Sequence, residues 1–144
     1  MSRTLLSDVE GLTNFYYYPD HPGALSMSMI RERSEKQYQK VESVLLSQYI
    51  NGTVDFLKLD TEGAETAIIQ ELQSKSKLRF IRNMAIEYHH HFEHYHFKQQ
   101  NDNFSKILSI LEDSNFGYQI KADSQIPIKK GLFQPIHIYA YQKF

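Results

Sequence analysis

The alternation of strand-like and helix-like segments after residue 53 most constrains what this chain can fold into. Residues 54–60, "VDFLKLD", are apolar apart from Asp55 and Lys58, which is typical of a strand covered on both faces. The next segment, 61–73, places apolar residues at helical spacing, with Ala64, Ala67, Ile68 and Leu72 on one face. Further along come a strand at 81–89, a helix within 103–118, and strands at 118–122 and 135–144. This order predicts an α/β fold, a mixed sheet with parallel strands joined by helices and a C-terminal antiparallel hairpin on one edge.

The first fifty residues give weaker signals. Segments 3–7 and 12–18 read as short strands that form a hairpin around "SDVEG". Residues 31–40 have almost no apolar content, so we expect an exposed loop or a frayed helix. Ser43 is a candidate N-cap for a short helix over 43–50. We expect one domain over 1–144, with an N-terminal hairpin and loop in 1–30 and an α/β half-sheet in 41–144.

Composition narrows the class of protein. The chain has 144 residues, 41% hydrophobic, with a formal net charge of −1 and no cysteine. Disulfides and cysteine-based zinc sites are therefore excluded, and the absence of a basic excess argues against nucleic acid as a partner. The first residues lack the apolar core of a signal peptide, and no apolar run is long enough to span a membrane. We expect a cytoplasmic protein with no membrane partner.

Charged residues follow two of the predicted strands at their carboxyl ends. "DTEGAE" places Asp60, Glu62 and Glu65 around the turn into the first helix, with Gly63 allowing a tight backbone. One interpretation is helix capping, by Asp60 or Thr61 side chains and by acidic residues that favour the helix dipole. The other is a functional carboxylate that positions a ligand amine or hydroxyl, or helps to hold a metal. Ligands of parallel α/β sheets bind at the carboxyl ends of strands, which favours a functional carboxylate at this turn.

The motifs "VDFLKLDTEGAE" and "MAIEYH", preceded by "LLSDVEGLTNFYYYPDHPGALSMS", resemble the signature of the FkbM-type methyltransferases. The resemblance covers nearly the whole chain. It implies a Rossmann-like class I methyltransferase fold, S-adenosylmethionine as cofactor, and methyl transfer to a hydroxyl of a small molecule or glycan. It also places the signature glutamate and histidine of the family at Glu87 and His89.

The chain departs from the family pattern in its cofactor half. Family members carry a glycine-rich turn after the first strand and an acidic residue after the second, and this sequence contains neither. We therefore expect only the acceptor-side, carboxyl-terminal part of the fold, no cofactor-binding residues, and little affinity for S-adenosylmethionine by this chain alone. The strand at 54–60 would then lie at an unprotected sheet edge, which predicts self-association or a partner covering that edge.

Five of the seven histidines fall within residues 89–96. If 84–89 is a strand, Glu87 and His89 share one face, and Tyr88 and His90 share the other. We predict His89 as the catalytic base, aided by Asp60 and Glu87, since an imidazole can take a proton from a hydroxyl near neutral pH. Candidate substrate-binding residues are Glu62, Tyr88 and His90.

Two other interpretations remain open. His-x-x-Glu-His at 90–94 matches a zinc-binding pattern on a helix, although the segment has no amphipathic face, so no metal site is predicted. The chain could also be a non-catalytic binding or assembly module derived from the enzyme.

Overall fold

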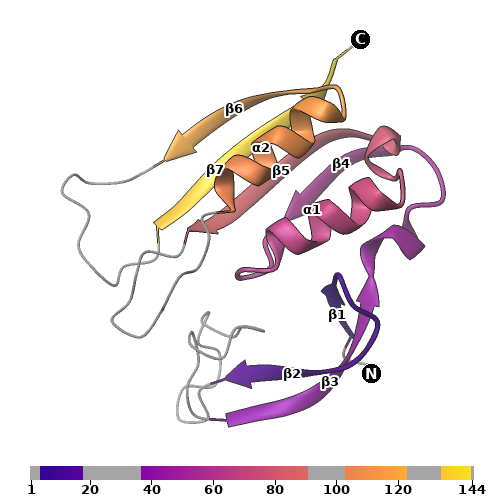
Figure 1. Ribbon diagram of the computed structural model, residues 1–144, viewed down its shortest axis with the longest axis vertical. Helices are drawn as coiled ribbons and strands as arrows, with labels where there is room; N and C mark the ends of the chain where they lie inside the picture. Colours follow the sequence, from indigo (N-terminus) through magenta and orange to yellow (C-terminus); the bar gives the residue numbers. More distant parts are fainter. Residues whose placement is uncertain (1–3, 18–36, 91–102, 123–133, 144) are drawn as a thin grey trace.

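The computed structural model describes residues 4–17, 37–90, 103–122 and 134–143 (Figure 1). The elements are β1 (Thr4–Ser7), β2 (Gly11–Tyr17), β3 (Gln37–Leu45), a 3₁₀ turn η2 (Leu46–Tyr49), β4 (Val54–Leu59), α1 (Glu65–Ser74), a second 3₁₀ turn η3 (Leu78–Phe80), β5 (Ile81–His90), α2 (Phe104–Asp113), β6 (Phe116–Ala122) and β7 (Gln134–Gln142). The strands form a three-stranded and a four-stranded sheet.

The four-stranded sheet has the order β4-β5-β7-β6. β4 and β5 are parallel, and α1 lies between them in sequence. β7 runs antiparallel to both of its neighbours, β5 and β6. The predicted α/β class, the mixed sheet and the C-terminal antiparallel pair are confirmed.

The core lies between this sheet and its two helices, which Figure 1 shows packed on the same face. The apolar periodicity of each helix produces this face, because residues three and four positions apart lie side by side. At most 1% of the side chain is exposed for Ile68 and Leu72 of α1, Ile107 and Leu111 of α2, and Met84, Ile86 and Ile138 of the sheet. Burying each contributes about 1.5–3 kcal/mol relative to an exposed position.

β4 is an edge strand of this sheet in the described part of the chain. The prediction that both of its faces are covered is wrong: Leu59 is buried, but Phe56 is 60% exposed. The helices cover only one face, so the alternate residues of β4 that point the other way meet solvent. The expected exposed edge is therefore present.

The N-terminal sheet differs from the predicted hairpin. Its order is β1-β3-β2, so β3 lies between the two short strands, parallel to β1 and antiparallel to β2. The predicted loop or helix at 31–40 is wrong over its described residues, and Ser43 caps no helix, because Gln37–Leu45 is strand. Of the helix predicted over 43–50, only the 3₁₀ turn η2 at Leu46–Tyr49 is present. Ser43 is buried, and its hydroxyl donates to the carbonyl oxygens of Val9 (2.7 Å) and Gly11 (2.9 Å). Pairing on both edges overrides the weak local preference of this polar segment.

Both helices end in a left-handed residue other than glycine. After α1, Ser76 has φ +54°, with the bonds Ser76 N to Gln73 O (2.9 Å) and Lys77 N to Leu72 O (2.8 Å) of a Schellman motif. After α2, Asn115 has φ +63°, and Gly117 lies further along, in β6 opposite Tyr141.

The two sheets meet where α1 contacts β1 and η2. Leu46, the first residue of η2, and Ile50, which follows η2, belong to the same buried cluster as the helix residues. None of the helices in the described ranges is long and apolar enough to cross a membrane. The single-domain organisation with its inner boundaries remains a prediction.

Candidate active site

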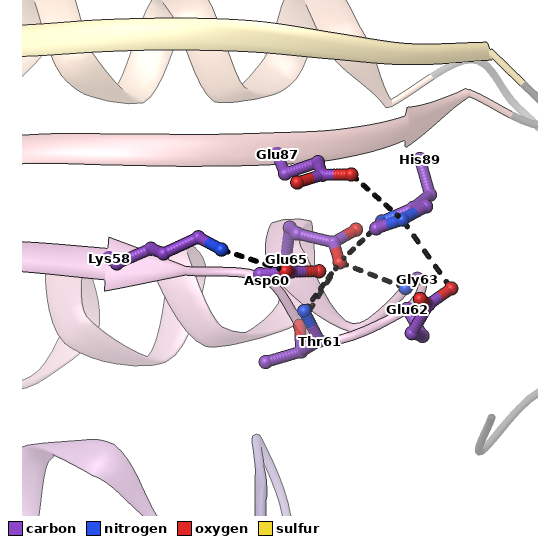
Figure 2. A network of polar contacts seen from close by, with 8 residues as sticks. All are labelled: Lys58, Asp60, Thr61, Glu62, Gly63, Glu65, Glu87 and His89. Atoms are coloured by element: carbon purple, nitrogen blue, oxygen red, sulfur yellow. Dashed lines mark hydrogen bonds and ion pairs between the residues drawn. The ribbon is translucent and has the colours of Figure 1, made fainter. Parts of the chain in front are cut away.

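The parallel pairing of β4 and β5 places their carboxyl ends side by side. Leu59 of β4 is in register with Ile86 of β5, so the turn at 60–65 lies next to Glu87 and His89 (Figure 2). The structure thus brings together four of the predicted site residues, Asp60, Glu62, Glu87 and His89.

His89 is the centre of this network. Only 5% of the residue is exposed, and a buried imidazole requires polar partners. Its Nδ1 lies 3.0 Å from Glu65 Oε1, while its Nε2 lies 3.4 Å from Glu62 Oε2 and 3.9 Å from Glu87 Oε1. The two ring nitrogens therefore have different surroundings: Nδ1 faces the start of α1, and Nε2 faces the carboxylates of the turn and of β5.

Glu65, the first residue of α1, is 1% exposed. Its Oε1 accepts hydrogen bonds from Thr61 N (3.1 Å), Thr61 Oγ1 (3.2 Å) and Gly63 N (2.9 Å). The expectation that Asp60 or Thr61 caps the helix is wrong, because α1 has no capping side-chain bond at its N-cap residue. Instead, the first helix residue accepts hydrogen bonds from backbone amides of the turn that precedes the helix.

Glu65 is ionised despite its burial. Burial raises the pKa of its carboxyl, but the hydrogen bonds from His89, Gly63 and Thr61, together with the charge of His89, outweigh that effect and lower the pKa below 4.5. Glu65 was not among the predicted site residues, although it stands in the acidic turn considered for a functional carboxylate. A glutamate following Thr and Gly in a strand-to-helix turn was the available signal.

The turn itself has an unusual backbone. Glu62 has φ +54° and Gly63 has φ +114°. The left-handed region costs a non-glycine residue about 1–2 kcal/mol. With this backbone conformation, the Glu62 carboxylate lies near His89 and the Gly63 amide donates to Glu65.

Acidic groups outnumber basic groups at the site. Asp60 pairs with Lys58 at 3.1 Å, and this hydrogen bond raises the pKa of the Lys58 amine. Donor atoms of Asp60, Glu62 and His89 lie within 4.8 Å of one another, close enough for one cation to bridge them. The arrangement suits ligands that donate hydrogen bonds or carry positive charge, such as hydroxyls, amines or a metal ion.

Another predicted residue, Tyr88, is not brought to this site. Tyr88 is 5% exposed and packs against Phe104 of α2, with ring centroids 5.4 Å apart, on the opposite face of β5. The side chain of His90 lies outside the described residues, as do His91, His94 and His96, so the structure does not test the zinc-binding pattern.

Glycines in the described ranges stand singly at 11, 52, 63 and 117. A Cβ at Gly117 would come within 2.5 Å of a ring carbon of Tyr141, so a side chain already fills that space. Gly63 is the glycine at the site, and its amide is taken by Glu65. The described residues therefore form no glycine-rich cradle.

Comparison with known proteins identifies the family. No curated protein and no solved structure matches the chain. A family model described as "Methyltransferase FkbM domain" matches residues 3–120, which is well over half of the sequence. The match includes β1 to β5, α1, α2 and all the residues of the His89 network. The chain therefore belongs to the FkbM methyltransferase family.

Proposed function

We propose that this chain carries the acceptor side of a Rossmann-like O-methyltransferase, with His89 as the base that takes the proton of an acceptor hydroxyl. The observation that supports the proposal is the buried His89 ring at the carboxyl end of β5, with Nδ1 at a carboxylate and Nε2 turned toward Glu62 and Glu87. In the family, S-adenosylmethionine supplies the methyl group.

The residues of this chain have two tasks. His89 Nε2 accepts the proton that the hydroxyl loses, which contributes typically 10²- to 10⁴-fold to a rate. Asp60, Glu62 and Glu87 are carboxylates that accept hydrogen bonds from further hydroxyls, and so orient the acceptor. A small molecule or glycan with several hydroxyls fits this set of acceptors.

Replacement of His89 tests the proposal. Transfer of labelled methyl groups from millimolar S-adenosylmethionine to a panel of polyhydroxylated acceptors is measured for the chain and for His89→Ala. The variant should lose about 10²-fold or more in turnover. His137→Ala is the control, because it removes a histidine that stacks on Tyr139 of β7. Equal turnover of His89→Ala and the parent chain would contradict the assignment.

A non-catalytic binding module is the second candidate, and the lack of a glycine-rich cradle among the described residues favours it. We propose weak binding of S-adenosylmethionine by this chain alone, with the exposed β4 edge covered by a second copy or a separate chain. Calorimetry separates the candidates: acceptor binding without any methyl transfer supports the module. Micromolar affinity for S-adenosylmethionine would contradict the proposed weak binding.

A further inference from the structure

Glu65 makes contacts that stabilising the turn does not require. A group that only stabilises the turn needs an oxygen that accepts hydrogen bonds from its backbone amides, and Glu65 Oε1 does this for Thr61 and Gly63. The same oxygen also lies 3.0 Å from His89 Nδ1, in a contact between two side chains that are both buried. We propose that Glu65 is a positioning residue, which decides which nitrogen of His89 carries a proton and where the ring points. This inference rests on the proposed function of His89.

The chemistry of the pair supports this role. An ionised carboxylate can only accept hydrogen bonds, so the His89 nitrogen that faces Glu65 must carry the proton. Nδ1 is therefore an N–H nitrogen in both the charged and the neutral ring, and in the neutral ring Nε2 is the nitrogen that takes a proton from an acceptor. After that transfer the ring is positively charged, and the buried negative charge of Glu65 stabilises it, as an aspartate does in hydrolase triads.

The turn holds Glu65 in this position. Three donors, Thr61 N, Thr61 Oγ1 and Gly63 N, converge on Oε1 at 2.9–3.2 Å. Rotation of the carboxylate away from His89 would leave these groups without their partner in a site where the residue is 1% exposed. The orientation of the His89 ring is thus set before an acceptor binds, which reduces the entropy cost of reaching a reactive geometry.

Glu65→Gln separates positioning of His89 from stabilisation of the turn. The amide oxygen of glutamine still accepts hydrogen bonds from Thr61 and Gly63, so the turn is kept, but the negative charge beside His89 is lost. Glu71→Gln is the matched control, because Glu71 lies on the same helix, is 7% exposed, and accepts a bond from Ser47 N at 3.3 Å, away from His89.

Two readouts are measured on the full chain at one neutral pH. The first is the nitrogen chemical shifts of the His89 ring by NMR, which report the protonation of Nδ1 and Nε2 without any substrate. The second is kcat and KM for the best acceptor. Glu65→Gln should change both ring shifts and lower kcat by about 10²-fold or more, with KM little changed. Glu71→Gln should change neither.

Parent-like ring shifts in Glu65→Gln would overturn the proposal. An equal loss of kcat in the two variants, corrected for the folded fraction, would also overturn it, because that result reports stability alone. If the parent chain transfers no methyl group, the proposed function fails, and the NMR comparison alone decides whether Glu65 sets the state of His89.

Discussion

Glu62 combines a strained backbone with a carboxylate at the site, so its replacement by glycine should separate stability from function. Ser76 has the same φ of +54°. It follows the end of α1 and is not part of the His89 network. Glycine adopts this region without steric cost. Glu62→Gly and Ser76→Gly therefore relieve the same strain, and only the first removes a group near His89.

The expected magnitude follows from two opposing effects. Relief of the left-handed conformation gains about 1–2 kcal/mol, whereas the greater freedom of glycine in the unfolded chain costs about 0.5–1 kcal/mol. Ser76→Gly should thus raise the free energy of unfolding by about 0.5–1 kcal/mol. Glu62→Gly also loses the 3.4 Å contact with His89, and the Glu62 side chain is 29% exposed. A partly exposed pair is worth at most about 1 kcal/mol, so the effect of Glu62→Gly should lie between a loss of about 0.5 and a gain of about 1 kcal/mol.

Equilibrium unfolding in urea measures both variants. With a denaturant slope of about 1–3 kcal/mol/M, the midpoint for Ser76→Gly should rise by about 0.2–1 M at an unchanged slope. In the transfer assay, Glu62→Gly should raise KM for the acceptor, and Ser76→Gly should not. A loss of more than about 1 kcal/mol in Glu62→Gly, beside a gain in Ser76→Gly, would refute the reasoning, because the His89 contact would then outweigh the strain.

Two further predictions concern acid and association. Because the folded pKa of Glu65 lies below 4.5, its stabilising contribution is present above that pH and is lost as the pH falls below it. The urea midpoint of the parent chain should therefore drop more steeply in acid than that of Glu65→Gln, and parallel drops would contradict this. Phe56→Lys on the β4 edge should weaken self-association in sedimentation, whereas Tyr49→Lys, equally exposed at 62% in η2, should not. A parent chain that sediments as a monomer at tens of micromolar would count against an edge contact.

The elements after residue 53 could be predicted because the spacing of their apolar residues matches the positions that are buried in the fold. Ile68 and Leu72 repeat at helical spacing and are buried against the sheet. β3 could not be predicted in the same way, because Lys40 and Glu42 make the segment look like a loop. Its strand conformation comes from pairing with β1 and β2 on both edges, which is a long-range effect that local propensity does not contain.

The part of the candidate site that lies at the carboxyl ends of strands could be predicted from the sequence. Asp60 and His89 follow two strands that proved to be parallel neighbours, and their proximity results from that pairing. The role of Glu65 could not be read in advance, because an acidic residue at a helix start has a sufficient local explanation. Its contact with His89 depends on how closely α1 approaches β5. Tyr88 was misplaced because its face of β5 is the one that the helices cover.

The position of β7 has a consequence for the order in which the chain folds. β7 is synthesised after every other element described, yet it lies inside the four-stranded sheet, between β5 and β6. During synthesis, β6 has no strand to pair with and β5 has an open edge until Gln134–Gln142 is available. An exposed edge of an incomplete sheet is prone to pair with another chain. Nascent chains that have not yet released β7 should therefore be prone to aggregation, and a ribosome stalled before residue 134 would hold such an intermediate.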